Sequence, residues 1–364
     1  MPAPRFHRLS IREVRPETAD AISVAFEVPP ALRDEYRFVQ GQFITLRETL
    51  DGEELRRAYS ICEGVPQYEA GAPLRVAIKR VAGGRFSNWA NDHLQAGRQI
   101  DVMTPDGRFH LPLDPAHGRH YAGFAGGSGI TPMLSLISTI LEREPESRFT
   151  LVYANRSSAS IMFVEALEAL KNRHMTRLRL IHVLSEESQE IELFSGVLDE
   201  ARCTRLLTAL LPAAGIDAAF VCGPQPMMDG VERALLAAGV APARILIERF
   251  GLPAPAPAAA AAAEVTADDG PRADVRVVID GKERRLSMPF QGRSILDAGL
   301  AAGANLPFAC KGGVCCTCRA RVLEGEVRML RNFTLEADEI ARGFVLTCQS
   351  VPVSERVVIS FDER

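Results

Sequence analysis

Short runs of alternating apolar and polar residues fill the first hundred positions of the chain. In one run Leu74, Val76 and Ile78 fall on one face and Arg75 and Lys79 on the other, which is the pattern of a half-buried strand. Runs of the same kind, separated by turn residues, lie at 10–29, 42–50, 54–61 and 99–109. One helical pattern near 86–94 interrupts them. The pattern predicts a small antiparallel β-barrel over residues 1–111.

The spacing of apolar residues changes between residues 112 and 250. Apolar runs alternate there with helical patterns and lie at 120–126, 149–155, 177–185, 218–223 and 243–250. The first helical pattern carries its apolar residues at helical spacing, namely Ile130, Met133, Leu134, Ile137, Ile140 and Leu141. Alternating strands and helices predict an α/β domain built on a parallel sheet.

A stretch rich in proline and alanine at 251–271 separates this part from the rest of the chain. It lacks large side chains and therefore predicts a semi-stiff linker. After it, Asp280-Gly281 stands between two strand-like runs, which indicates a hairpin. A short helical pattern at 294–302, a cysteine-rich loop and a closing strand-like run at 356–361 follow. We expect a third, α+β domain over 272–364, and the predicted fold class is multi-domain.

Composition and charge narrow the function classes. The chain has 364 residues, 47% of them apolar, which is enough for two or three packed cores. Its 42 basic and 46 acidic residues leave a net charge of −4 and no polybasic stretch, so neither nucleic acid nor an anionic membrane surface is an expected partner. The chain shows no apolar run of membrane-spanning length and no signal-peptide pattern, so we expect a cytoplasmic protein without stable membrane insertion.

Five of the eight cysteines lie in the last 55 residues. Cys310, Cys315 and Cys318 follow the spacing C-x4-C-x2-C, and Cys348 stands 30 positions later. In a reducing compartment such a group predicts a metal site, and this spacing is typical of plant-type [2Fe–2S] clusters. Four thiolates also suit zinc, but zinc sites favour two C-x2-C pairs and only one is present. The extra thiol, Cys316, is expected to pack without binding metal.

With this loop, residues 272–364 resemble the β-grasp domain of plant-type ferredoxins. The resemblance implies that Cys310 and Cys315 hold one iron and that Cys318 and Cys348 hold the other. The segment departs from soluble plant ferredoxins in its charge, because residues 271–364 contain 14 basic and 12 acidic residues whereas those ferredoxins are strongly acidic. We therefore expect its redox partner not to be recruited through an acidic docking face.

Two motifs in the barrel segment suit a flavin nucleotide. In the motif at 57–60 an Arg can pair with phosphate, a Tyr face can cover the flavin ring and a hydroxyl can approach it, although Arg and Tyr also alternate on ordinary strands. In the motif at 83–88 two glycines precede a helix start, which suits an anionic diphosphate. The cofactor-binding candidates of this segment are Arg57, Ala58, Tyr59, Ser60, Ile78, Lys79, Gly84, Arg85, Phe86 and Ser87.

Three stretches of the α/β segment suit a nicotinamide nucleotide. A glycine loop at 126–129 stands between a strand and a helix, with Thr131 placed to cap the helix and Pro132 in its first turn. The loop lacks the GxGxxG order and could be only a turn. The stretches 153–156 and 222–224 follow the second and fourth strands, at the edge where such sheets bind ligands. The candidates are Gly126, Gly127, Ser128, Gly129, Thr131, Pro132, Arg156, Cys222, Gly223 and Pro224. Cys222 could equally be a buried structural thiol.

In this order the motifs resemble the ferredoxin–NADP⁺ reductase superfamily across residues 5–250. The resemblance implies that Arg57, Tyr59 and Ser60 bind or face the flavin and that Arg85, Phe86 and Ser87 hold its diphosphate. It places Thr131 and Cys222 near the nicotinamide, which makes Ser60, Thr131 and Cys222 the catalytic candidates. It also makes Phe250 the C-terminal aromatic residue near the flavin.

The nucleotide preferences follow from two details. FAD is favoured over FMN because the motif at 83–88 supplies a second phosphate clamp that a mononucleotide would not use. Arg156, Ser157 and Ser158 could receive a 2′-phosphate, which favours NADPH over NADH. Arg156 could equally be a solvated loop cation.

Together the three segments suit a chain that splits electron pairs, because a flavin can accept two electrons and release them singly to a [2Fe–2S] cluster. The domain order resembles the reductase components of multicomponent oxygenases, and residues 312–350 are similar to the reductases of ring 1,2-phenylacetyl-CoA epoxidases. That resemblance implies a di-iron oxygenase component as the electron acceptor. The alternatives are a reductase for a hybrid-cluster protein, a Rieske oxygenase or a desaturase, and a non-enzymatic redox-sensing module.

Overall fold

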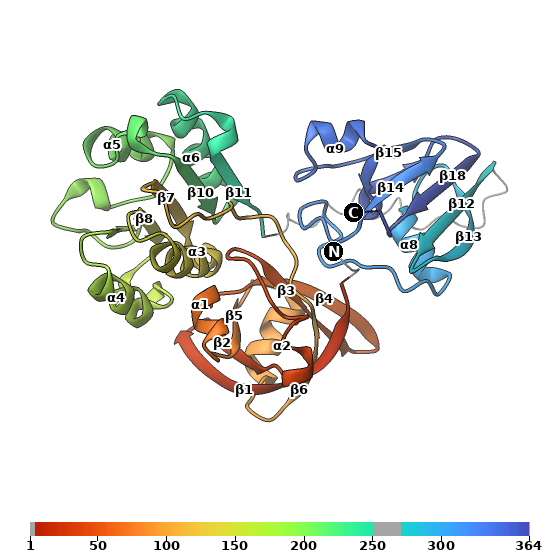
Figure 1. Ribbon diagram of the computed structural model, residues 1–364, viewed down its shortest axis with the longest axis horizontal. Coiled ribbons are helices and arrows are strands. Elements are labelled where there is room, and N and C mark those ends of the chain that lie inside the picture. The colour runs from red at the N-terminus through yellow and green to blue at the C-terminus, as the bar shows by residue number, and fades with distance from the viewer. Residues whose placement is uncertain (1–3, 251–270, 364) are drawn as a thin grey trace. The chain divides into compact units, whose positions relative to one another are not determined.

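The computed structural model describes residues 4–250 and 271–363, and the chain divides into two compact units (Figure 1). The larger unit comprises residues 6–55 and 59–250, and the smaller one is formed mainly by the C-terminal segment. The predicted linker at 251–271 lies outside the described residues except for Pro271. None of the helices within 4–250 and 271–363 has the length and apolar character needed to cross a membrane.

An antiparallel barrel forms the first part of the larger unit. Its elements are the strands β1 (Phe6–Thr18), β2 (Ala21–Glu27), β3 (Phe43–Leu50), β4 (Glu53–Ser60), β5 (Leu74–Lys79) and β6 (Gln99–Met103) and the helices α1 (Val65–Glu69) and α2 (Arg85–His93). The strands hydrogen-bond in the order β4-β3-β6-β1-β2-β5, and a bridge between Ile61 and Val76 joins the two ends of that order. The predicted barrel is confirmed.

The alternation in the sequence sets the inside of the barrel. Leu74, Val76 and Ile78 are fully buried, whereas Arg75 and Lys79 keep part of their surface exposed. The run at 10–29 forms two strands instead of one, because the chain reverses between Thr18 and Ala21, which pair with each other. Burial of every second side chain is thus what holds the strands in register.

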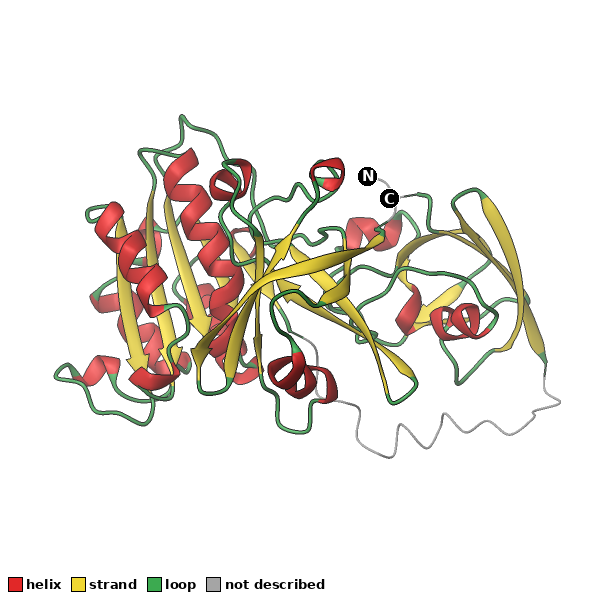
Figure 2. Ribbon diagram, turned by 90° about the horizontal axis from the view of Figure 1, so that it is seen from below, coloured by secondary structure: helices red, strands yellow, loops and turns green. Residues whose placement is uncertain are grey.

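A five-stranded parallel sheet forms the second part of the larger unit. Its strands are β7 (His120–Gly126), β8 (Arg148–Asn155), β9 (Leu178–Leu184), β10 (Ala218–Cys222) and β11 (Ile245–Glu248), in the order β11-β10-β7-β8-β9. Its helices are α3 (Ile130–Arg143), α4 (Val164–Arg173), α5 (Glu200–Ala209) and α6 (Gln225–Ala237). Buried residues of α3 and α4 pack on one face of the sheet and those of α5 and α6 on the other (Figure 2).

Parallel strands place all their carboxyl ends at one edge of the sheet. The glycine loop after β7 and the segments after β8, β9 and β10 therefore meet there. This is the edge at which open α/β sheets bind ligands. The fold thus collects the stretches 126–129, 153–156 and 222–224, which are far apart in the sequence.

The smaller unit is an α+β fold. Its strands are β12 (Arg272–Ile279), β13 (Lys282–Pro289), β14 (Arg319–Glu324), β15 (Val327–Met329), β16 (Phe344–Leu346), β17 (Ser350–Pro352) and β18 (Arg356–Ser360), and its helices are α8 (Ile295–Ala301) and α9 (Ala337–Ala341). One sheet has the order β13-β12-β18-β14-β16, and β15 pairs with β17. The predicted hairpin is confirmed, since Asp280 and Gly281 both have positive φ, 50° and 69°, between β12 and β13.

Candidate functional site

The four predicted cluster ligands lie in two segments of the smaller unit. Cys310, Cys315 and Cys318 belong to the loop between α8 and β14, and Cys348 lies in a short turn after β16. The turn is tied to the loop because Thr347 donates two hydrogen bonds to the Cys318 carbonyl, from its backbone N–H at 3.1 Å and from its hydroxyl at 2.9 Å. These bonds hold the turn that carries Cys348 against Cys318.

The four thiols form two hydrogen-bonded pairs. Cys315 donates to Cys310 and Cys318 donates to Cys348, which lowers the pKa of each acceptor and raises that of each donor. The Gly312 N–H also donates to the Cys310 sulfur at 3.2 Å. Within the described parts of the chain, no three His, Cys, Asp or Glu side chains converge as the ligands of one ion would. The thiols of Cys310 and Cys315 thus lie close to each other, and so do those of Cys318 and Cys348.

The loop around these thiols depends on unusual backbone geometry. Gly313 has φ +80°, a conformation that favours glycine, and Cys316 has φ +57°. The Cys316 thiol donates to the Thr334 hydroxyl oxygen at 3.0 Å, so the extra cysteine connects the loop to a neighbouring segment. This contact agrees with the expectation that Cys316 packs, whereas the ligand roles of the other four cysteines remain predictions.

In the larger unit, Ser60 at the end of β4 meets Glu248 at the end of β11. The Ser60 hydroxyl, almost fully buried, donates to a Glu248 carboxylate oxygen at 3.0 Å. Burial raises the pKa of Glu248 to about 8, although the hydrogen bond from Ser60 acts in the opposite direction. Glu248 also pairs in register with Cys222 on β10, and burial raises the pKa of that thiol. Two of the three catalytic candidates therefore lie beside one carboxyl group.

Glu248 was not among the predicted site residues. It could have been found as an acidic residue inside the apolar run 243–250. Acidic side chains are rarely buried unless they are paired, so one in such a run indicates a functional or paired group. Phe250, two residues further on, is 45% exposed and was predicted to lie near the flavin. That role remains a prediction.

The flavin candidates differ in how accessible their side chains are. Tyr59 is partly buried, with the centroid of its ring 6.0 Å from that of Phe86, and Arg57, three residues before the end of β4, is exposed. Ile78 and Phe86 belong to the barrel core, with 0% and 1% of their surface exposed, so their side chains pack inside the barrel. Ala58 is partly buried.

The predicted diphosphate segment begins α2. Gly84 is the residue before the helix, and the Ser87 hydroxyl accepts a hydrogen bond from the Val81 N–H at 3.1 Å. Arg85 is paired with Glu53 and stands 3.6 Å from Asp51. The first turn of a nine-residue helix offers backbone N–H groups to an anion, which fits the predicted use of this segment.

The glycine loop after β7 packs against the end of β10. A Cβ atom on Gly129 would stand 2.0 Å from the Cys222 carbonyl oxygen, and one on Gly126 would stand 2.6 Å from the Pro224 ring. Only glycine permits this approach. The loop at 126–129 and the stretch 222–224 therefore form one surface, on which Gly223 also lies, as the sequence predicts for a nucleotide site.

One local prediction here is wrong. Thr131 does not cap α3, because the helix already begins at Ile130 and the Thr131 hydroxyl donates to the Ser128 carbonyl at 3.0 Å. Pro132 does lie in the first turn, as expected. A short 3₁₀ turn at Gly127–Gly129 leads directly into the helix and leaves no place for a side-chain cap.

The groups predicted to receive a 2′-phosphate are already paired with carboxylates. Ser158 donates from its backbone N–H and from its hydroxyl to one oxygen of Glu187, at 3.0 and 3.1 Å. Arg156 stands 3.7 Å from Asp20, which also lies 3.5 Å from Lys79.

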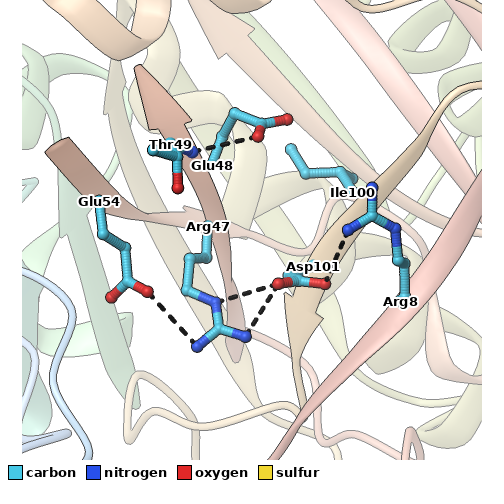
Figure 3. A pocket seen from close by; sticks show the side chains of 7 residues that line it. All are labelled: Arg8, Arg47, Glu48, Thr49, Glu54, Ile100 and Asp101. Atoms are coloured by element: carbon cyan, nitrogen blue, oxygen red, sulfur yellow. Dashed lines mark hydrogen bonds and ion pairs between the residues drawn. The ribbon is translucent and has the colours of Figure 1, made fainter. Parts of the chain in front are cut away.

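A cavity of about 230 Å³ lies elsewhere, on the barrel (Figure 3). Arg47 crosses it to Asp101 at 2.8 Å and to Glu54 at 3.6 Å, and Arg8 approaches Asp101 at 3.9 Å. None of its lining residues was a site candidate. Since Arg8, Arg47, Glu54 and Asp101 pair with one another, we assign the cavity a structural role rather than a place in the redox chemistry.

Comparison with known proteins assigns a domain type to each part. The chain matches the models of the oxidoreductase FAD-binding domain over residues 9–111, the oxidoreductase NAD-binding domain over 124–233 and the 2Fe-2S iron-sulfur cluster binding domain over 277–353. These matches confirm the three predicted cofactors, FAD, a nicotinamide nucleotide and a [2Fe–2S] cluster.

Two relatives align over almost the whole chain. The chain is 44% identical to a component of the 1,2-phenylacetyl-CoA epoxidase of Escherichia coli (strain K12), covering 99% of this chain and 98% of that protein. It is 35% identical to the ferredoxin reductase component of 3-ketosteroid-9-alpha-monooxygenase of Rhodococcus rhodochrous, covering 97% and 96%.

The fold is similar to that of a solved reductase. Phthalate dioxygenase reductase aligns with a TM-score of 0.57 and 23% identity over 98% of each chain, a likeness that concerns the fold alone. With FAD-, NAD- and [2Fe–2S]-binding domains and a full-length relative at 44% identity, the chain belongs to the iron–sulfur flavoprotein reductases of the ferredoxin–NADP⁺ reductase superfamily and is an NAD(P)H-dependent oxidoreductase.

Proposed function

We propose that the chain is the reductase component of a phenylacetyl-CoA epoxidase and delivers electrons to its di-iron oxygenase component. The observation that carries this proposal is the 44% identity to a component of such an epoxidase over nearly the full length of both proteins. A relative aligned from end to end shares the domain order as well as the separate domains. The acceptor is therefore inferred from the whole chain rather than from one motif.

The described residues fit the separate roles of the flavin and the iron–sulfur cluster in such a reductase. When bound, FAD would accept two electrons from NAD(P)H and the [2Fe–2S] cluster would pass them on one at a time. Cys310, Cys315, Cys318 and Cys348 would hold the two irons, supported by their spacing and by the match of residues 277–353 to a 2Fe-2S cluster binding domain. Near the expected nicotinamide edge, the Ser60 hydroxyl donates a hydrogen bond to Glu248, and Cys222 lies beside Glu248 in the sheet.

A second candidate acceptor rests on a specific observation. The chain is 35% identical to the reductase component of a 3-ketosteroid-9-alpha-monooxygenase, again over nearly its full length. The acceptor could accordingly be the oxygenase component of a monooxygenase of that type. The higher identity to the epoxidase component favours the first candidate.

Reconstitution with purified components tests the acceptor. The holoprotein would be mixed with NAD(P)H and either the epoxidase oxygenase components with phenylacetyl-CoA or the ketosteroid oxygenase with its steroid. We expect oxidation of NAD(P)H to be coupled to formation of the epoxide in the first mixture. Coupled turnover in the second mixture alone would assign the chain to the other oxygenase, and cytochrome c reduction serves as the control that the reductase itself is active.

A further inference from the structure

One surface segment of the smaller unit, residues 328–333, lies against the predicted cluster loop. The Leu330 N–H donates to the Gln349 carbonyl at 2.7 Å, and Gln349 directly follows a predicted cluster ligand. The Phe333 N–H donates to the Gly313 carbonyl at 3.2 Å, within the loop that carries the other three ligands. These two bonds hold the segment 328–333 beside the cysteines.

The segment presents large apolar side chains to solvent. Val327 and Met329 pack against the core of the unit, so the alternation of β15 turns Arg328 and Leu330 outward. Leu330 is 57% exposed and Phe333 is 44% exposed. Two exposed apolar side chains within four residues, interleaved with arginines, have the character of a protein-binding surface.

The positive charge of the segment is not neutralised within the part of the chain that the structure describes. Neither Arg328 nor Arg331 forms an ion pair with any described residue. Three other arginines of the smaller unit each pair with a carboxylate, namely Arg319, Arg321 and Arg342. The segment 328–333 contains no acidic residue. It therefore offers two positive charges that an acidic partner surface would neutralise.

Hydrogen bonds fix the backbone of the segment. The Asn332 carboxamide oxygen accepts from the Thr334 N–H at 3.2 Å and from the Leu335 N–H at 2.9 Å. The Asn332 amide group donates in turn to the Leu335 carbonyl at 2.9 Å. Because this turn is already formed, little backbone ordering would be needed when a partner binds.

We propose that residues 328–333 are the surface on which the oxygenase component docks, and that the docked partner presents acidic side chains around an apolar pocket. Leu330 and Phe333 supply the apolar anchors, and Arg328 and Arg331 direct the approach. A partner seated on Leu330 is one hydrogen bond away from the residue that follows a predicted cluster ligand, so the surface is placed for electron transfer. The inference rests on the proposed function in that the partner is an oxygenase component.

Surface plasmon resonance tests the charged part of the proposal. The cluster-loaded full chain would be passed over the immobilised oxygenase component of the epoxidase and, in parallel, over the ketosteroid oxygenase. We expect Arg328→Glu/Arg331→Glu to lower the association rate constant at least about tenfold at low salt and to reduce its dependence on salt. Lys282→Glu/Arg285→Glu makes the same change of charge on β13, at the edge of the sheet opposite β16, and should lower this constant less than about threefold.

A second pair of substitutions tests the apolar anchors. We expect Leu330→Ser/Phe333→Ser to raise the dissociation rate constant at least about tenfold. Leu323→Ser is the matched control, because Leu323 of β14 is similarly exposed, and it should change that constant less than about twofold. All variants are compared at equal iron and sulfide content, so that loss of the cluster cannot imitate loss of docking.

The outcomes separate this inference from the proposed acceptor. Undiminished binding of either double variant to the epoxidase oxygenase would overturn the docking surface and leave the proposed acceptor standing. Binding to the ketosteroid oxygenase alone, weakened by the same substitutions, would refute the proposed acceptor and leave the surface standing. Binding of the unmodified chain to neither oxygenase would refute both. Self-association that light scattering detects and Leu330→Ser/Phe333→Ser abolishes would assign the surface to a second copy of the chain and overturn the inference.

Discussion

The Ser60 hydroxyl donates a hydrogen bond of 3.0 Å to the Glu248 carboxylate, although 188 positions of sequence separate the two residues. The bond joins the last residue of a barrel strand to the last residue of the parallel sheet's β11. It places a hydroxyl and a carboxyl group beside Cys222, at the edge where the nicotinamide is expected.

We expect Ser60→Ala to slow ferricyanide reduction by about ten- to a hundredfold, because a positioned hydroxyl near the reacting atoms would be lost. Stopped-flow measurement of flavin reduction by the nucleotide checks this. The control is Ser135→Ala, since Ser135 is also buried and its hydroxyl has no partner among the described residues. Equal rates in both variants would show that Ser60 has no part in the reaction.

The stability of the folded chain should depend on pH through the ionisation of Glu248. Its pKa in the folded chain is about 8 against an ordinary 4.5, so the folded chain keeps a proton that the unfolded chain releases. The stabilisation from this protonated group is complete below pH 4.5 and is lost as the pH rises towards 8. Glu248→Gln cannot ionise, so relative to it the natural chain should lose stability over that range. The midpoint temperature of thermal FAD release, measured for both proteins between pH 5 and 9, gives the difference in stability. The same pH dependence in both proteins would contradict the raised pKa of Glu248.

Cys315→Ser should separate the two redox centres. Loss of one thiolate is expected to prevent cluster assembly and lower cytochrome c reduction at least about a hundredfold, while ferricyanide reduction stays within about twofold. Visible absorbance and iron and sulfide analysis measure the loss. Cys316→Ser is the control and should keep the cluster, because that thiol bonds to Thr334. Zinc in place of iron in the natural protein would refute the cluster altogether.

Gly129→Ala should disrupt the nucleotide edge. The new methyl group would stand 2.0 Å from the Cys222 carbonyl oxygen, so α3 and β10 must move apart at a cost of about 2 kcal/mol or more. Gly215→Ala is the matched control, since a Cβ there meets nothing within 4 Å, and it should change stability by less than about 0.5 kcal/mol. Chemical denaturation measures the free energy of unfolding of the two variants. Similar values would show that the residues around Gly129 can move to accommodate a methyl group.

Several features of this protein were decided by residues close together in the sequence. Alternation with a period of two predicted the barrel strands, and Asp280-Gly281 predicted the hairpin, because a turn depends only on its own backbone angles. The spacing of Cys310, Cys315 and Cys318 predicted a cluster loop, because these three ligands lie within nine residues of one another. The glycine loop was recognised from its place between a strand and a helix.

Tertiary structure alone decided which distant groups meet. The approach of Glu248 to Ser60 depends on packing the barrel against the parallel sheet, and no local pattern encodes it. The carboxylate of Glu187 reaches Ser158 only because β8 and β9 are neighbours, a result of strand order. Local sequence sets backbone angles and the buried face of each element, whereas burial of those faces against one another sets the contacts between elements. The candidate residues were therefore predictable from the sequence, but the partners that pair with them in the folded chain were not.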